Sequence, residues 1–350
     1  MIYIIDGLKG ITDFVEVYQS NIWNVQYFGQ SDFQLITTAT EENINKLAVG
    51  RYLVREEDLG DGFQNVMVIE GQKLAYDSDV GWMLTVTGRG LKSIVGRRIV
   101  WKQTTMSGTF ERAVRQIIND NIINPEDAKR RITNFTMEAE KGYTDTADIQ
   151  LLGENIADWL ASSCESYGYG WDVYIKDGQY VFRLYKGEDR SYNQDVNTPV
   201  VFSEEYDNLL QSNYTHNREG YGNAALIGGE GEGVNKRTAT IGDTEDLGRY
   251  EQYIDGSSVS SNGAIITVEQ YMKLLEDYGK DQLTATDVTK FSGEILPDGI
   301  FKINEDYFLG DIVQIDTKRG ITATPRIIEI IYAEDTNGFS VVPTFSEWEV

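Results

Sequence analysis

The sequence predicts an α+β protein that is mostly β, with strand-rich segments at both ends of the chain and an α+β segment between them. Short runs of β-branched and aromatic residues, separated by Gly, Asp or Asn, dominate both ends. Apolar residues at helical spacing concentrate between residues 101 and 190. The 34 glycines against 5 prolines favour tight turns over disorder, and 350 residues suit two to four domains.

Residues 1–100 are predicted to consist mostly of strands. Apolar and polar residues alternate over residues 14–18 and 23–27, as they do in half-buried strands. Similar composition predicts further strands at residues 33–36, 52–54, 65–69 and 82–87. A short helix is predicted at residues 91–95, and the whole segment favours a small barrel or sandwich.

Residues 101–190 are predicted to form an α+β unit. Apolar residues at helical spacing predict a helix at residues 109–122: Phe110, Val114, Ile117 and Ile118. A second helical stripe ends at Gly168 and contains Ile156, Trp159, Leu160, Cys164 and Tyr167. Asp177 and Gly178 then separate two alternating runs, which is a strong signal for a β-hairpin.

The rest of the chain is predicted to return to strands around one more helix. Strands are predicted at residues 200–202, 209–214 and 223–227, and a loop at residues 256–263. Thr267 and Gln270 match a capping box, and a helical stripe follows at Tyr271, Leu274, Leu275 and Tyr278. The last three β-rich runs predict an antiparallel meander: residues 312–315, 323–332 and 339–345.

The net charge of −25 is uneven along the chain. Residues 1–150 carry 16 Lys and Arg against 21 Asp and Glu, a net of −5, whereas residues 151–350 carry 15 against 35, a net of −20. This field argues against a protein that grips phosphate backbones. It suits either a surface kept soluble by like charges or a surface past which DNA slides without sticking.

Neither a secretion signal nor a membrane span is predicted. The N-terminus lacks a basic region and a long apolar stretch, and no apolar run approaches the roughly 20 residues that a membrane helix needs. The sequons at Asn134 and Asn213 are therefore interpreted as coincidental. The single cysteine, Cys164, excludes an internal disulfide and a Cys-rich zinc site, as expected for a chain made in a reducing cytoplasm.

Two glycine-rich motifs are weak candidates for cofactor binding. Residues 228–233, Gly-Gly-Glu-Gly-Glu-Gly, lack the Lys-Ser/Thr of a P-loop, and their glutamates would repel phosphate. Gly88 and Gly90 stand between a predicted strand and helix, but the third glycine of a dinucleotide fingerprint is misplaced and no β-α-β series surrounds them. A turn explains the first motif better, and we predict no cofactor.

The sequence contains no positive evidence of catalysis. His216 is the only histidine, and a Cys164–His216 nucleophile pair has no family signature around either residue. Carboxylate clusters that could imitate a glycosidase pair lie in turn-like, solvated contexts: Glu56, Glu57 and Asp58; Glu204 and Glu205; Glu305 and Asp306. No calcium loop is present. We therefore predict no catalytic, cofactor-binding or metal-binding residue.

Four patches, in the same order along the chain, resemble the hub proteins at the tail tip or baseplate of long-tailed bacteriophages. The first is residues 27–40, YFGQSDFQLITTAT, which follow the strand bearing Trp23. The second joins VGRYLVRE, residues 49–56, to the run that ends at Arg97, Arg98 and Val100. The third is residues 221–237, YGNAALIGGEGEGVNKR, which resemble the siphophage version found in Gram-positive hosts, and the fourth is the closing meander.

The resemblance implies a fold of two barrel-like antiparallel β domains. Residues 1–100 would form the first, and residues 191–240 with 290–350 the second. Residues 101–190 would form the intervening α+β domain, and residues 241–289 a helical and loop insertion. Three such subunits would close a homotrimeric ring of pseudo-sixfold symmetry.

The same resemblance implies a structural role, without enzymatic activity, in the virion of a phage or prophage. The trimer would adapt a sixfold tail ring to a threefold tip and provide a channel for the tape measure protein and DNA. Its partners would be the distal tail ring, the tape measure and the tail fibres or receptor-binding proteins, with DNA only as passing cargo. Many such hubs continue into a wall-degrading domain, which is not expected in a chain that stops at Val350.

Two alternative functions are a wall-degrading tail enzyme with a carboxylate pair and a wall-carbohydrate-binding adhesin. The second is suggested by the 21 Tyr and 6 Trp of the chain.

Overall fold

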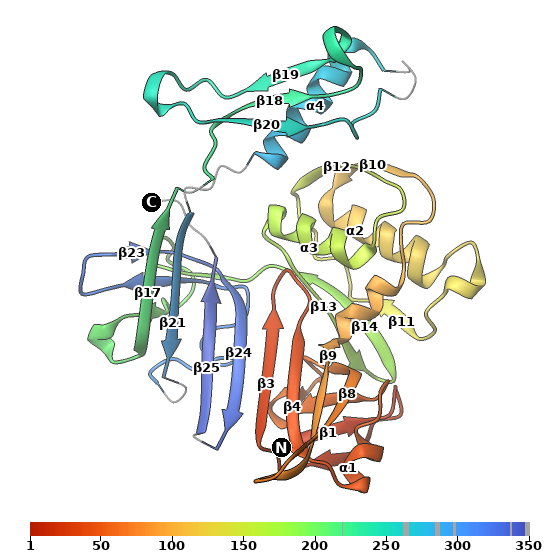
Figure 1. The fold of residues 1–350 in the computed structure, drawn as a ribbon, viewed down its shortest axis with the longest axis vertical. Helices are drawn as coiled ribbons and strands as arrows, with labels where there is room; N and C mark the ends of the chain where they lie inside the picture. Colours follow the sequence, from red (N-terminus) through yellow and green to blue (C-terminus); the bar gives the residue numbers. More distant parts are fainter. Residues whose placement is uncertain (219, 262–265, 284–287, 297–298, 337, 347–350) are drawn as a thin grey trace. The chain divides into compact units, whose positions relative to one another are not determined.

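The computed structural model describes residues 1–350 except 219, 262–265, 284–287, 297–298, 337 and 347–350 (Figure 1). The described chain forms two compact units. The first contains Met1–Asn213 and Phe291–Ser346, and the second contains Tyr214–Lys290. The four-segment division predicted from the sequence stays a prediction.

One sheet of eleven strands organises the first unit, and it is mostly β as the sequence predicts. Its order is β17-β21-β25-β24-β3-β4-β9-β8-β5-β1-β2. The N-terminal strands are β1 Ile2–Ile5, β2 Ile11–Val15, β3 Ser20–Gln26, β4 Asp32–Thr38, β5 Tyr52–Arg55, β8 Met67–Asp77 and β9 Gly81–Gly90. The C-terminal strands are β24 Ile327–Asp335 and β25 Gly338–Phe345, and the outer strands are β17 Leu209–Asn217 and β21 Val288–Ile295.

The two ends of the chain meet within this sheet. Strand β24 pairs antiparallel with β3 over seven residues, from Glu329 opposite Gln26 to Asp335 opposite Ser20. Figure 1 shows β24 and β3 side by side at the join between the C-terminal and N-terminal strands. Trp23 is fully buried at this join, and its indole Nε1 donates a hydrogen bond to the carbonyl of Asn65 at 3.1 Å. The N-terminal and C-terminal halves therefore share one continuous hydrogen-bonded sheet.

Two smaller β groups and two helices make up the segment after the first strands. Strands β13 Gly170–Lys176 and β14 Gln179–Tyr185 form the predicted hairpin, with β11 Phe135–Met137, β7 Gly62–Phe63 and β6 Leu59–Gly60 in the same sheet. Strands β10 Thr104–Thr109 and β12 Thr146–Leu151 pair separately. Helix α2 is Phe110–Ile118, extended by a π-helical turn at Asn119–Ile123, and α3 is Ile156–Tyr167. The predicted helices are confirmed here, because Phe110 and Leu160 pack in the same buried core as Trp171.

Helix α3 ends as its sequence predicts. Gly168 adopts φ +71°, and the amide of Tyr169 donates to the carbonyl of Cys164 at 2.9 Å. Substituting Gly168→Ala should lower the free energy of unfolding by about 1 kcal/mol, because an L side chain in the left-handed region costs about that much. Urea denaturation followed by Trp fluorescence measures the change. Gly153→Ala is no neutral control, since Gly153 also has positive φ, so Ala161→Ser in the same helix serves instead.

The predicted C-terminal meander is only partly confirmed. Strand β22 Ile312–Asp316 pairs antiparallel with β23 Thr322–Ala323, at the start of the second predicted run, but it also pairs in parallel with β15 Asp189–Arg190 and β16 Val201–Phe202, in a sheet separate from β24 and β25. Strand pairing switches around Pro325, which has no amide hydrogen to donate. Before it, Ala323 faces Ile315, and after it, Ile327 faces Phe345. The run predicted as one strand at residues 323–332 is therefore divided between two sheets.

The second unit is a three-stranded sheet with one helix. Its order is β19 Thr238–Ile241, β18 Ala224–Gly228 and β20 Glu251–Asp255, and helix α4 is Val268–Gln282. The predicted capping box at Thr267 and Gln270 is confirmed. Tyr271 and Leu275 of the helix are fully buried against the sheet. The sequence missed β19 and β20, and part of its predicted loop at residues 256–263 lies outside the described residues.

Candidate interaction surfaces

The β8–β9 hairpin presents apolar side chains that nothing in the described chain covers. Leu74 is 49% exposed, Tyr76 64%, Val80 56% and Trp82 56%. Tyr76 lies directly opposite Trp82 in the ladder, and their rings are 5.5 Å apart between centroids. Apolar side chains that gather on an exposed surface mark sites of protein association.

The exposed face of the hairpin continues the face that packs inside. Leu84 and Val86 of β9 are fully buried, and Leu84 lies opposite Leu74 on the same face as Trp82 and Tyr76. Helix α1, Glu41–Lys46, marks where the cover ends, because Gln72 Nε2 donates at 2.9 Å to the carbonyls of Ile44 and Leu47. Beyond this helix, no described residue covers the apolar face. We call Leu74, Tyr76, Val80 and Trp82 the hairpin face.

The sequence contained part of the signal for the hairpin face. A strand is predicted at residues 82–87, but the strand predicted at residues 65–69 extends to Asp77 in the structure. Gln72, Leu74 and Tyr76 alternate with Lys73 and Ala75, and a turn with two aspartates follows. This pattern indicates a hairpin. Its exposure could not be predicted, since the same residues would fit a buried strand equally well.

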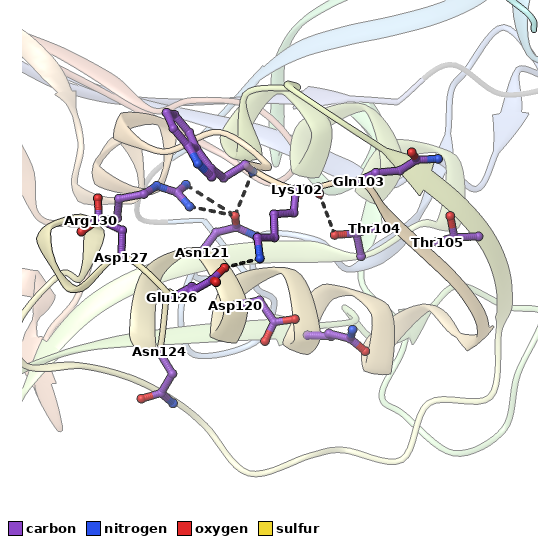
Figure 2. A pocket seen from close by; sticks show the side chains of 12 residues that line it. Lys102, Gln103, Thr104, Thr105, Asp120, Asn121, Asn124, Glu126, Asp127 and Arg130 are labelled. Carbon is purple, nitrogen blue, oxygen red and sulfur yellow. Dashed lines mark hydrogen bonds and ion pairs between the residues drawn. The ribbon is translucent and has the colours of Figure 1, made fainter. Parts of the chain in front are cut away.

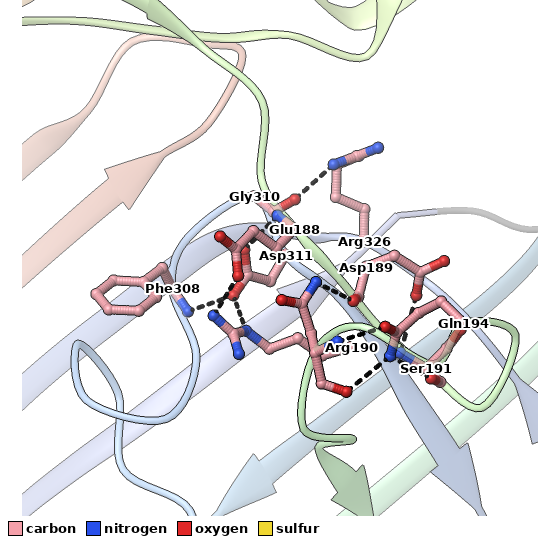
Figure 3. Close-up of polar contacts among 10 residues, drawn as sticks. Glu188, Asp189, Arg190, Ser191, Gln194, Phe308, Gly310, Asp311 and Arg326 are labelled. Atoms are coloured by element: carbon pink, nitrogen blue, oxygen red, sulfur yellow. Dashed lines mark hydrogen bonds and ion pairs between the residues drawn. The ribbon is translucent and has the colours of Figure 1, made fainter.

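Asp311 ties the linker after β14 to the loop before β22 (Figure 3). Its carboxylate is 2% exposed and accepts hydrogen bonds from the Arg190 Nε at 2.7 Å, the Glu188 amide at 2.7 Å and the Phe308 amide at 3.0 Å. A carboxylate that is paired and accepts several N–H groups is well compensated for burial. The cluster fixes the C-terminal strands against the α+β segment.

A second buried ion pair lies where β5 meets the C-terminal strands. Arg55 and Asp58 are each 4% exposed, and Arg55 Nε donates to the Asp58 carboxylate at 2.6 Å. Asn65 donates to the other oxygen of Asp58, also at 2.6 Å. The guanidinium of Arg55 stacks 3.6 Å from the ring centroid of Tyr332 in β24. The pair therefore connects N-terminal and C-terminal strands. Of the cluster Glu56, Glu57 and Asp58, only Asp58 is buried.

A hollow of about 780 Å³ lies beside α2 (Figure 2). Trp101, 60% exposed, lines it with polar side chains from residues 102–130. Lys102 and Glu126 form an ion pair across it, and Arg130 contacts the Asn121 side-chain oxygen at 3.4 Å. The guanidinium of Arg130 also lies 4.8 Å from the ring centroid of Trp101. Its polar lining suits a solvated surface for contacts rather than an enclosed cofactor site.

The two glycine-rich motifs have structural explanations. Residues 228–233 follow β18 as a turn into the antiparallel strand β19, and Glu230 accepts a hydrogen bond from the Ser261 amide at 2.7 Å. Gly88 lies inside β9, where a Cβ atom would be 1.8 Å from the Val68 carbonyl oxygen. Its glycine is required by close packing of neighbouring strands. The prediction that neither motif binds a cofactor stays a prediction.

The remaining chemical candidates lie on several different elements of the described chain. Cys164 is buried in the first unit, and burial raises the pKa of its thiol, which is the opposite of what an activated nucleophile needs. His216 belongs to the second unit. Glu204 accepts from the Lys318 amide at 3.1 Å, and Asp306 accepts from the Lys302 amide at 2.8 Å. Within the described residues, no group of three His, Cys, Asp or Glu side chains could hold a metal ion.

Comparison with protein families identifies the chain. Residues 1–345 match the model of the Siphovirus ReqiPepy6 Gp37-like protein family. The chain belongs to this family. No curated protein matches it in sequence. None of the helices in the described ranges has the length and apolarity to cross a membrane.

Solved structures of phage tail proteins share this fold at low sequence identity. A tail protein from Neisseria meningitidis is similar with a TM-score of 0.59 and 13% identity, over 99% of this chain and 96% of the other. A 43 kDa prophage MuSo2 tail protein from Shewanella oneidensis gives 0.57 and 13%, over 99% and 98%. The prophage tail protein gp18 from Listeria monocytogenes gives 0.52 and 13%, over 99% and 95%. This siphovirus family member therefore has the fold of phage and prophage tail proteins, as the sequence resemblance predicted.

Proposed function

We propose that this siphovirus family member is a structural subunit of the tail tip, where three copies form a hub. The hub adapts a sixfold tail ring to a threefold tip and leaves a channel for the tape measure protein and DNA. The observation that carries this proposal is the hairpin face. An isolated monomer has no use for four large apolar side chains in a row at the end of a long hairpin, whereas a ring subunit buries them against its neighbour.

The shared sheet supports the same role. Joining β24 to β3 aligns two sets of antiparallel strands into one extended surface in each subunit, so three subunits would supply six sets around a ring. The surrounding partners in this proposal are the distal tail ring, the tape measure and the receptor-binding proteins. DNA passes through the channel without being bound, and the net charge of −25 favours that passage. The role is structural and needs no catalytic residue.

The position in the virion is tested by immunogold electron microscopy on particles released from the producing bacterium. Antibody to this chain should place gold only at the distal end of the tail. Gold along the tail shaft, or on the head, would contradict the tip position. Protein that is absent from all particles and free in solution would overturn the structural role. Hydrolysis and binding assays on host wall would then be the next measurements.

The role of the hairpin face is tested with Tyr76→Ser and Trp82→Ser together. We expect the wild-type protein to sediment as a trimer and the double variant as a monomer, since the lost apolar contact area is the main source of association energy. Analytical ultracentrifugation measures the mass. Val196→Ser is the matched control, because Val196 is 90% exposed in a loop of the same unit. A trimeric double variant would remove the hairpin face from the interface.

A further inference from the structure

A strongly basic surface stands out on this acidic chain. Residues 97–131 carry eight Lys and Arg against four Asp and Glu, a net of +4 in a chain of net −25. One of the four carboxylates, Glu111, is buried and accepts hydrogen bonds from the amides of Lys141, Gly142 and Tyr143. It does not neutralise the surface.

The positive side chains gather around one shallow hollow. A hollow of about 280 Å³, next to the larger one in Figure 2, is lined by Arg97, Arg98, Ile99, Trp101, Asp127, Lys129 and Arg130. We call its four cations and Trp101 the basic face. Trp101 is 60% and Ile99 37% exposed, so apolar surface accompanies the charge. Aromatic and arginine side chains together are typical of protein interfaces.

Hydrogen bonds to backbone carbonyls fix two of the arginine side chains of the basic face. Arg98 Nε donates to the Arg130 carbonyl at 2.6 Å, and Arg130 Nη2 donates to the Ile99 carbonyl at 2.7 Å. These bonds link the segment after β9 to the segment after α2, and they orient both guanidinium groups. Burial first, and then the neighbouring positive charge of Arg98, lowers the pKa of Arg130. Like charges are therefore held together at some cost.

The four cations of the basic face have no ion-pair partner among the described residues, although the chain as a whole is acidic. In the part of the chain that the structure describes, Arg97, Arg98, Lys129 and Arg130 form no ion pair. Asp127 is the carboxylate that lines the hollow, and it accepts the Lys129 amide at 3.0 Å to cap a short 3₁₀ turn, Ala128–Arg130. Lys102 at the edge of the face pairs with Glu126. The basic face therefore carries uncompensated positive charge that a carboxylate-bearing molecule could pair with.

We propose that the basic face of one subunit docks on the carboxylate-rich surface of a second copy of this chain. The inference rests on the proposed function, since it assigns a subunit contact within that ring. One chain carries both complements: a net of +4 over residues 97–131 and a net of −20 over residues 151–350. Two different complementary surfaces on one chain form a head-to-tail contact, and such contacts close into rings when the rotation fits. Charge pairing at the rim would set the register, and the apolar hairpin face would supply most of the affinity.

Zero-length carbodiimide cross-linking of the full-length protein tests the contact directly. Protein labelled with nitrogen-15 is mixed with unlabelled protein, so a cross-link that contains one labelled and one unlabelled peptide must join two copies. We expect such mixed cross-links from Lys129 or Lys102 to Asp or Glu within residues 151–350. The Lys102–Glu126 pair provides an internal control, because it should give cross-links within one chain. Same-chain cross-links alone from residues 97–131 would overturn the proposal.

Charge reversal tests the same contact by a different readout. Arg97→Glu with Lys129→Glu should weaken self-association at least tenfold by sedimentation equilibrium. The wild-type protein should associate more weakly at 0.5 M than at 0.05 M NaCl, because salt screens exposed charges. Lys9→Glu with Lys318→Glu, which makes the same change in charge at exposed positions, should leave association unchanged. Trp fluorescence confirms that both variants are folded.

Three further results would overturn the inference. The first is self-association that is equal in the wild-type protein and the Arg97→Glu, Lys129→Glu variant. The second is binding of a DNA duplex that this variant loses while its self-association stays intact, which would make nucleic acid the partner. Either result leaves the proposed tail-tip role to be decided by the immunogold experiment, so the two ideas fail separately. A monomeric wild-type protein at high concentration also excludes the docking of two copies.

Discussion

Substituting Asp311→Ala is expected to lower the free energy of unfolding by about 4 kcal/mol, because it removes one partner of a buried ion pair together with the acceptor of two backbone amides. Asp311 accepts three hydrogen bonds, and the side chain of its partner Arg190 is only 14% exposed. The variant leaves that guanidinium with Glu188 as its remaining carboxylate, at 2.7 Å. Two backbone amides also lose their acceptor, and each such loss costs about 1–3 kcal/mol when water cannot reach it.

Urea denaturation followed by the fluorescence of the buried Trp23 and Trp171 measures this change. The exposed Glu305→Ala, in the same loop, is the matched control and should change the unfolding free energy by less than about 0.5 kcal/mol. Asp311→Asn separates charge from hydrogen bonding: it keeps one acceptor oxygen and should fall between the wild-type protein and the alanine variant. A loss below about 1 kcal/mol in the alanine variant would show that the cluster is solvated and does not hold the loops together.

Substituting Asp58→Ala is expected to cost about 3–5 kcal/mol, the range for removing one partner of a buried ion pair. Arg55 would then remain buried against the rings of Tyr332 and Trp23, and its Nη2 already has no hydrogen-bond partner among the described residues. Asn65 would lose its acceptor as well. The damage falls where β5 contacts β24, so the join between N-terminal and C-terminal strands should loosen.

Hydrogen exchange and chemical denaturation together measure the effect of Asp58→Ala. The amides of β3 and β24 should exchange faster, and the unfolding midpoint should fall. The exposed neighbour Glu57→Ala is the control. Replacing both partners, Arg55→Met with Asp58→Leu, should restore much of the stability, because two well-packed apolar side chains do not carry the desolvation penalty of the charges. A double variant as unstable as Asp58→Ala would show that packing, not charge, decides stability here.

The helices could be predicted from the sequence because their signals are local. The stripe from Ile156 to Tyr167, with Gly168 after it, specifies a helix and its end within about four turns of chain. The capping box at Thr267 and the turn at Asp177 and Gly178 work in the same way. These signals depend on hydrogen bonds between residues that are only a few positions apart.

Strand partners could not be predicted in the same way. The β-rich run at residues 312–315 pairs antiparallel with β23, as a meander strand would, but it also pairs in parallel with the distant strands β15 and β16. The partners of β22 depend on which distant strands lie beside it in the fold. Pro325 interrupts the antiparallel pairing after β23, because proline has no amide hydrogen to donate. Strand β24 finds its partner β3 about 300 residues away, as in the pair of Ile330 and Val25. Composition alone contains no information about that pairing.

The residues of the two candidate surfaces could be recognised in the sequence, but their grouping could not. The paired arginines at 97 and 98 belong to the stretch that resembles the hub family, and the aromatic residues of the hairpin face are present in the sequence. Only the folded chain shows that Trp101 and Lys129 line the same hollow as these arginines, and that Tyr76 and Trp82 extend past the last covering helix.

The sequence by itself determined the mostly β class, the three main helices, the hairpins with strong turn signals and the resemblance to tail hubs. Tertiary structure decided which strands share a sheet, which carboxylates are buried and which cations lack partners. Local periodicity and turn chemistry act within about ten residues. Burial and charge pairing depend on atoms brought together from distant parts of the chain, as Asp58 beside solvent-exposed Glu57 illustrates.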